Sequence, residues 1–256
     1  AEERAPATLR LLCDSYALDL GRRGKSPDSI ARVKDTTKRL EEFLGKRMDE
    51  PLTKLTEAGV YDFREHRTTA GAKASTVNRD LRSLRAMLKK ALPAFRFPAG
   101  AFFKEDETRV RWLEPIQELD VMSRIPSPFD KMCRLAALTL MRLTEIRTLR
   151  REHVALSQGV VTLVKTKAQE PQVVVLSAEA RDILQKQLDC HGSDWVFPNP
   201  SGRPYSRVHV SRIWRKAARA AGLTDFHFHD LRHDGATKAL NAGYSAPIVM
   251  ALGRWK

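Results

Sequence analysis

The stretch HDLRHDGAT, residues 229–237, places a histidine and an arginine three positions apart, at His229 and Arg232. On a helix this spacing puts both side chains on one face. Two such donors can bind a phosphate, and a helix that opens at His229 would add the amides of its first turn. They can equally form an ordinary solvated pair, because charged helix faces are common. These residues alone leave both interpretations open.

Two further cations lie in contexts that suit the same chemistry. Arg142 lies in the apolar segment TLMRLTEIRTL, where a buried arginine needs an anion to balance its charge. Glu145 on the same helix could supply that charge, and for Arg142 alone this is the simpler explanation. Lys167 lies in KTKAQEP, between two apolar runs, where a surface lysine is also ordinary. Each residue by itself is a weak indication of a phosphate site.

The charge balance points to a polyanionic partner. The 256 residues are enough for one large or two ordinary domains. Lys and Arg number 45 against 31 Asp and Glu, and the net charge of +14 is spread over both halves of the chain. Such an excess favours binding to nucleic acid through phosphate contacts and counterion release. We therefore expect a nucleic-acid-binding protein.

Other classes of protein find no support in the sequence. The cysteines Cys13, Cys133 and Cys190 have no spacing typical of a metal site, and we expect them to be reduced. No apolar run is long enough to span a membrane, and the first ten residues lack the apolar core of a signal peptide. The sequence thus predicts no metal, no membrane and a cytoplasmic, DNA-associated location.

The first part of the chain predicts a bundle of about four helices. Apolar residues recur at helical spacing in four segments: 8–20, 26–45, 55–69 and 75–92. In the second segment, Ser26 is a typical N-cap, Pro27 a typical first residue and Gly45 a typical stop. The last segment carries exposed cations beside its apolar stripe of Val77, Leu81, Leu84 and Leu88, and they suit a solvated face or a phosphate backbone equally. These candidate DNA-binding residues are Arg79, Arg82, Arg85 and Lys89.

Residues 93–112 contain two prolines and a glycine, so we expect an interdomain linker there. Beyond it the pattern is mixed. Residues 129–149 predict a helix, and the short apolar runs 160–164 and 172–176 predict a β-hairpin around Lys167. Further helical patterns follow up to residue 253. The second part is therefore expected to be mostly α with a small sheet.

The order and spacing of these residues resemble the tyrosine recombinases, the phage integrase family. LTLMRLTEIRTL is similar to the family's first arginine motif, with Arg142 as the first catalytic arginine and Glu145 as the acidic residue that follows it. TKAQEPQVVVL resembles the family's β-hairpin, with Lys167 at the usual lysine position. HDLRH resembles the HxxR box, which contributes His229 and Arg232.

The resemblance covers nearly the whole chain. STVNRDLRSLRAMLKKA is similar to the last helix of the family's core-binding domain, and DWVFPNPSGRPYS to the loop before the HxxR helix. It implies a mainly α fold with a small β-sheet. Residues 1–92 would form a helical, SAM-like core DNA-binding domain, and residues 113–256 a mixed α/β catalytic domain.

The resemblance also implies a reaction. In the family a tyrosine hydroxyl attacks the scissile DNA phosphate, a 3′-phosphotyrosine forms and a 5′-hydroxyl leaves, with no metal or nucleotide cofactor. Arg142 and Arg232 would meet the charge on the non-bridging oxygens. Lys167 would protonate the leaving oxygen, and His229 would orient the phosphate or assist proton transfer.

The sequence departs from the family pattern in two places around these motifs. Leu140 replaces the glycine usual before the first arginine. ALG at 251–253 resembles the start of the last motif, and Arg254 then follows where the family has His and sometimes Trp. The neighbouring Trp255 leaves this alignment open by one residue. Arg254, counted with the catalytic residues, can donate to a phosphate but cannot act as a neutral base.

The largest departure concerns the nucleophile. The family's tyrosine follows the LG motif, whereas the four tyrosines here all precede it: Tyr16, Tyr61, Tyr205 and Tyr244. Tyr244 is the nearest, and a half-buried loop aromatic explains it more simply. We therefore expect the nucleophile to lie outside this chain, which by itself would be inactive in cleavage.

Three functions agree with these observations. The first is a site-specific integrase or recombinase, of phage or bacterial type, which acts on paired sites in double-stranded DNA. It would be a homo-oligomer, a tetramer on its sites, with accessory DNA-bending proteins as further partners. The second is a catalytically silent or truncated DNA-binding protein of the same fold. The third is an enzyme that only relaxes supercoils by the same covalent chemistry.

Overall fold

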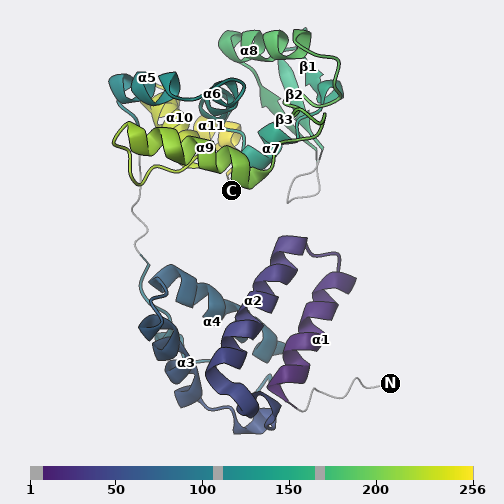
Figure 1. Ribbon diagram of the computed structural model, residues 1–256, viewed down its shortest axis with the longest axis vertical. Helices are drawn as coiled ribbons and strands as arrows, with labels where there is room; N and C mark the ends of the chain where they lie inside the picture. Colours follow the sequence, from purple (N-terminus) through teal and green to yellow (C-terminus); the bar gives the residue numbers. More distant parts are fainter. Residues whose placement is uncertain (1–7, 106–111, 165–170, 256) are drawn as a thin grey trace. The chain divides into compact units, whose positions relative to one another are not determined.

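The computed structural model describes residues 8–105, 112–164 and 171–255 (Figure 1). The chain divides into two compact units, Ala1–Thr108 (unit 1) and Arg109–Lys256 (unit 2), each with its own apolar core. The structure is mainly helical with one small sheet, which confirms the predicted fold class. The predicted domain limits stay a prediction.

The described part of unit 1 is a bundle of helices: α1 (Leu9–Arg22), α2 (Pro27–Leu44), α3 (Glu57–Thr69) and α4 (Ala74–Ala91), with 3-10 turns at Gly45–Asp49, Leu52–Lys54 and Ala99–Ala101. The predicted limits of the second helix are confirmed. The Ser26 hydroxyl accepts a hydrogen bond from the Ser29 amide, Pro27 is the first residue, and Gly45 ends the helix with a φ of 54°.

Helix α4 connects the bundle to the segment expected as a linker. Its apolar stripe is buried as predicted. On the same helix the Asn78 side chain donates to the Phe103 carbonyl and accepts from the Phe103 amide, both at 2.8 Å. Phe95 and Phe97 also pack against the core of unit 1. Residues 93–103 therefore belong to the packing of unit 1.

Unit 2 combines helices with a three-stranded antiparallel sheet in the order β1-β2-β3, as far as the described residues show. Its strands are β1 (Val154–Ala155), β2 (Val160–Leu163) and β3 (Gln172–Val175). Its α-helices are α5 (Pro115–Ser123), α6 (Phe129–Thr139), α7 (Leu143–Arg147), α8 (Ala178–Asp189), α9 (Arg207–Ala220), α10 (Asp230–Asn241) and α11 (Ala246–Gly253), and a 3-10 turn spans Arg151–His153.

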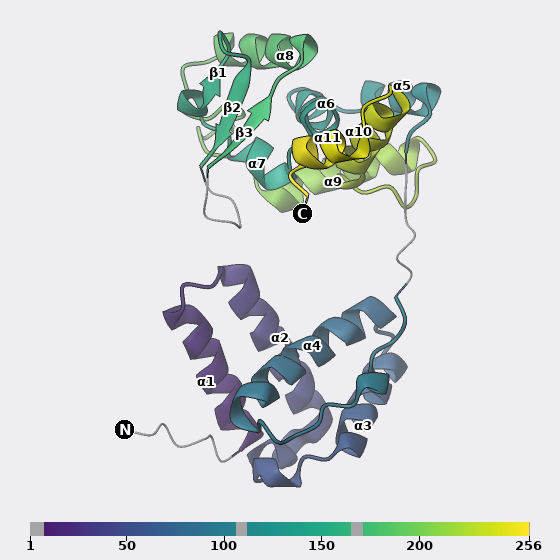
Figure 2. The ribbon, with the colours of Figure 1, turned by 180° about the vertical axis from the view of Figure 1, so that it is seen from behind.

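The two views of unit 2 agree on its layout (Figures 1 and 2). The sheet and α8 lie at one side, whereas α5, α9, α10 and α11 lie at the other. Helix α6 contacts α7, α8, α9 and α10 and so forms the centre of the unit. Val161 of β2 pairs with Val174 of β3, which confirms the predicted hairpin. No helix in the described ranges is long and apolar enough to cross a bilayer.

The helical structure is interrupted between α6 and α7, just before Arg142. The prediction of one helix over 129–149 is wrong, because Leu140 adopts the left-handed conformation with a φ of 53° and ends α6. A glycine would adopt this conformation without strain, which explains why the family motif has a glycine at the position of Leu140. Its side chain is instead buried, 4% exposed. The break places Arg142 at the N-cap of α7.

Helix α10 is held firmly on its neighbours. The fully buried Asp234 carboxylate accepts from the Leu113 amide at 2.7 Å and from Lys238 Nζ at 2.8 Å. One residue later, a Cβ atom built on Gly235 would lie 2.0 Å from the Ala137 carbonyl oxygen of α6. This contact requires glycine, so the two helices approach each other closely just beyond Arg232.

Candidate active site

Three arginines from separate elements lie close together, and two of them pair with one carboxylate. Arg142 comes from the start of α7, Arg232 from the first turn of α10, and Arg254 directly follows α11. Arg142 Nη1 lies 2.9 Å from Glu145 Oε1, and Arg254 Nη2 lies 2.8 Å from Glu145 Oε2. The structure thus brings together four of the residues singled out in the sequence, although they span more than a hundred positions.

Arg232 is the most enclosed of the three arginines, at 1% exposed. Its Nη1 donates to the Leu140 carbonyl, and its Nη2 donates to the Gly253 carbonyl. The Trp255 ring covers the guanidinium, with its centroid 4.6 Å from Cζ. These contacts fix the plane of the guanidinium, and the sequence did not indicate the role of Trp255 in them.

Arg254 turns into the protein rather than toward solvent. Its backbone is left-handed, with a φ of 54°, and its side chain is 6% exposed. Besides Glu145, its Nη2 contacts the Leu140 carbonyl at 3.3 Å. The Leu140 carbonyl therefore accepts from both buried arginines.

The arginines retain unused donors. Arg232 Nε, Arg254 Nε and Arg254 Nη1 are buried and have no hydrogen-bond partner among the described residues. Burial, followed by the charges of Arg142 and Arg254, lowers the pKa of Arg232 to about 10. Because unpaired buried donors and crowded like charges are both unfavourable, the site favours an anion. A phosphate fits this requirement, since guanidinium forks match its oxygens.

His229 lies at the N-cap of α10, as predicted, beside this cluster. Its ring meets the His233 ring edge-on at 5.2 Å, and the His233 ring stacks on Trp255. Desolvation of the ring, followed by the charges of His233 and Arg232, lowers the pKa of His229. The neutral ring is therefore favoured at pH 7, in a form that can accept a proton.

We expect the His229 ring in the free protein to titrate below 6.5. Because the folded state disfavours its protonation, the stabilisation that this group contributes is present above pH 6.5 and is lost as the pH falls. A ring-proton NMR titration measures this pKa, and His229→Gln identifies the resonance. Adding DNA should raise the pKa of His229, since a nearby phosphate favours the charged ring. A value of 6.5 or above in the free protein would contradict the prediction.

Lys167 lies outside the described residues, so its predicted position in the site is not tested. The strands that flank it, β2 and β3, are described. Between α7 and β2 lies a pocket of about 570 Å³, lined by Glu145 and by Thr144, Thr148 and Thr162 among others. The pocket therefore runs from Glu145, the carboxylate that Arg142 and Arg254 share, to the end of β2.

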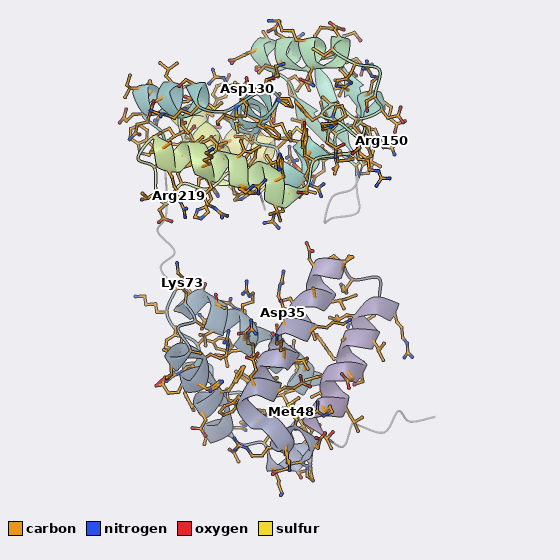
Figure 3. All side chains as sticks on the ribbon, in the orientation of Figure 1. Asp35, Met48, Lys73, Asp130, Arg150 and Arg219 are labelled. Carbon is orange, nitrogen blue, oxygen red and sulfur yellow. The ribbon has the colours of Figure 1, made fainter. Side chains whose placement is uncertain are left out.

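Two surfaces carry unusually many cations. In unit 1 the side chains of Arg79, Arg82, Arg85 and Lys89 are exposed on α4, and Arg82 pairs with Glu105 at 2.7 Å. In unit 2, helix α9 contains no acidic residue, and Arg212, Arg215 and Arg219 are exposed at spacings of three and four. Arg219 lies on the outer side of α9 (Figure 3). This face was not predicted from the sequence, although the absence of Asp and Glu over 14 residues indicated it.

Comparison with known proteins relates this arrangement to one family. The model of the phage integrase family matches residues 116–256. The integrase of Salmonella phage P22 is 28% identical over 183 residues, which cover 66% of this chain and 46% of that protein. The tyrosine recombinase XerC of Lactobacillus leichmannii is 30% identical over 176 residues, 64% of this chain and 55% of that protein. The chain thus spans about half of the length of these relatives.

A solved structure shares the fold. A lambda integrase dimer bound to a COC′ core site matches with a TM-score of 0.79 and 19% identity, over 96% of this chain and 94% of that chain. The family model covers more than half of the present chain, including all three arginines. We conclude that this protein is a member of the phage integrase family.

Proposed function

We propose that this chain binds double-stranded DNA and supplies the phosphate-activating site of a site-specific integrase. The observation that carries the proposal is the convergence of Arg142, Arg232 and Arg254, with buried donors left unpaired. The relatives support it, since they are integrases and recombinases. The solved neighbours include a lambda integrase tetramer bound to a Holliday junction. We propose a homo-oligomer on paired DNA sites by the same reasoning.

The site would act on the charge of the reacting phosphate. A tyrosine hydroxyl attacks phosphorus, the bond to the 5′-oxygen breaks, and the 3′-phosphotyrosine preserves the energy needed for rejoining. Arg142 and Arg232 stabilise the negative charge on the non-bridging oxygens. Lys167 protonates the leaving oxygen, and neutral His229 orients the phosphate or relays a proton. The attacking hydroxyl is assigned to none of the four tyrosines of this sequence, because in the family pattern the tyrosine follows residues 252–253.

A strand-joining reaction tests the phosphate site without that tyrosine. Duplexes that bind the protein are first selected from a random pool and then prepared with a nick. One side of the nick carries a 3′-p-nitrophenyl phosphate and the other a 5′-hydroxyl. The hydroxyl attacks phosphorus, p-nitrophenolate leaves with the aryl oxygen, and the strand is sealed. We expect the protein to accelerate release of p-nitrophenolate. Binding without acceleration would overturn the proposal in favour of a silent DNA-binding protein.

The basic face of α9 gives a second expectation. Replacing Arg212, Arg215 and Arg219 together by glutamine should weaken duplex binding. It should also make the slope of log K, the logarithm of the association constant, against log salt concentration shallower by about one for each lost phosphate contact. Fluorescence anisotropy at several salt concentrations measures both quantities. Lys186→Gln on α8, whose lysine pairs with Asp182 at 2.8 Å, is the control. An unchanged slope in the triple variant would show that α9 does not contact the DNA.

A further inference from the structure

Glu145 holds two arginines of very different exposure. Its Oε1 accepts from Arg142 Nη1 at 2.9 Å, and its Oε2 accepts from Arg254 Nη2 at 2.8 Å and from the Arg142 amide at 2.7 Å. The Arg142 side chain is 45% exposed, whereas those of Glu145 and Arg254 are 10% and 6% exposed. One partner of the carboxylate can therefore move into solvent, and the other is enclosed.

This difference matters because Arg142 has two possible anionic partners. In the structure its guanidinium faces Glu145, but stabilising a reacting phosphate requires at least part of it to turn toward the DNA. A carboxylate that is 10% exposed would resist losing its only cation, since an uncompensated buried charge is strongly unfavourable. With Arg254 in place, Glu145 keeps one cation after Arg142 has moved.

We propose that Arg254 is a positioning residue that neutralises Glu145 and thereby allows Arg142 to transfer from the carboxylate to the scissile phosphate. The inference rests on the proposed function and adds a role for Arg254 that differs from direct phosphate binding. Its contact with the Leu140 carbonyl, which also accepts from Arg232, holds the Arg254 guanidinium at the carboxylate. Without Arg254, Glu145 would retain Arg142 and compete with the DNA.

The proposal predicts the sign of a double-variant experiment. Arg254→Asn removes the guanidinium, and asparagine tolerates the left-handed backbone of this position. We expect it to slow strand joining on the nicked p-nitrophenyl duplex by about tenfold, a coupling ordinary for one ion-pair network. Adding Glu145→Gln should restore the rate to within about threefold of the unmodified protein, because Gln keeps an acceptor for the Arg142 amide but no longer competes through its charge.

Two further variants and a stability measurement make the result specific. Arg254→Lys, which retains the charge, should react faster than Arg254→Asn. Arg151→Gln removes another arginine of unit 2, which donates to the Leu188 and His191 carbonyls, and should leave the rate per folded molecule unchanged. Thermal unfolding gives the folded fraction of every variant. If Arg254→Asn does not fold, Arg254→Met replaces it and fills more of the vacated volume.

The outcomes separate the two proposals. If the unmodified protein does not accelerate joining, the proposed function fails and the role of Arg254 fails with it. If it does accelerate joining, but the double variant is no faster than the single one, Arg254 acts directly on the phosphate or only on the fold, and the inference is overturned. Recovery in the double variant supports charge sharing at Glu145.

Discussion

Replacing Arg232 by alanine is expected to reduce strand joining on the nicked p-nitrophenyl duplex about a thousandfold, with DNA affinity changed by no more than about threefold. Arg232 is the arginine whose plane is fixed most completely, by two backbone carbonyls and the Trp255 ring. Such a preorganised donor contributes mostly where charge develops during the reaction. Affinity depends instead on many phosphate contacts spread over the protein surface. Release of p-nitrophenolate and fluorescence anisotropy measure the two effects separately.

Loss of the buried Arg232 also leaves the Gly253 carbonyl without this donor and the Leu140 carbonyl with Arg254 alone, so the variant will be less stable. Rates are therefore compared per folded molecule, with Arg151→Gln as a control that loses a partly buried guanidinium bonded to backbone carbonyls. Arg232→Lys should recover only part of the rate, because an ammonium group lacks the planar fork. A normal rate of strand joining in Arg232→Ala would show that Arg232 does not act on the phosphate.

Gly235→Ala is expected to lower the free energy of unfolding of unit 2 by about 3 kcal/mol, at the upper end of ordinary overpacking. The new methyl group would lie 2.0 Å from the Ala137 carbonyl oxygen, which belongs to the rigid backbone of α6. Helix α10 must then move away from α6 and carry His229 and Arg232 with it. The intrinsic helix preference of alanine over glycine, about 1 kcal/mol, offsets only part of the cost.

Tryptophan fluorescence during urea unfolding measures this change for unit 2 alone, because Trp112, Trp195, Trp214 and Trp255 all belong to that unit. Gly192→Ala is the control, since its Cβ would meet no atom within 4 Å and its backbone is not left-handed. We expect it to stay within about 0.5 kcal/mol of the unmodified protein. Equal stability of the two variants would show that α10 and α6 can separate without loss.

Local sequence signals predicted much of this fold. Ser26, Pro27 and Gly45 delimit α2 because capping depends on residues a few positions apart. The hairpin of β2 and β3 was predictable because short β-branched runs on either side of a polar turn favour antiparallel pairing. In the site, the motif spacing singled out Arg142, Glu145 and Arg232, and the structure places them together.

The remaining features depend on tertiary packing. Leu140 and Arg254 are left-handed although neither is a glycine, so no local preference indicated the break after α6 or the inward turn of Arg254. The stacking of Trp255 on Arg232 joins α10 to the residues after α11 and has no signature at either position alone. The catalytic roles of these residues stay predictions that the proposed experiments test.

The carbonyl oxygen of Leu140 accepts from both buried arginines. Alanine scanning does not detect such an acceptor, because every residue type has the same backbone carbonyl group. What orients the oxygen is the left-handed backbone at position 140, and the Leu140 side chain packs into the core with Ala236 and Val249. Exchanging one apolar residue for another in that core can therefore change the orientation of the Arg232 and Arg254 guanidiniums without altering any charged group. The orientation of the two buried arginines thus depends on hydrophobic packing as much as on their charged partners.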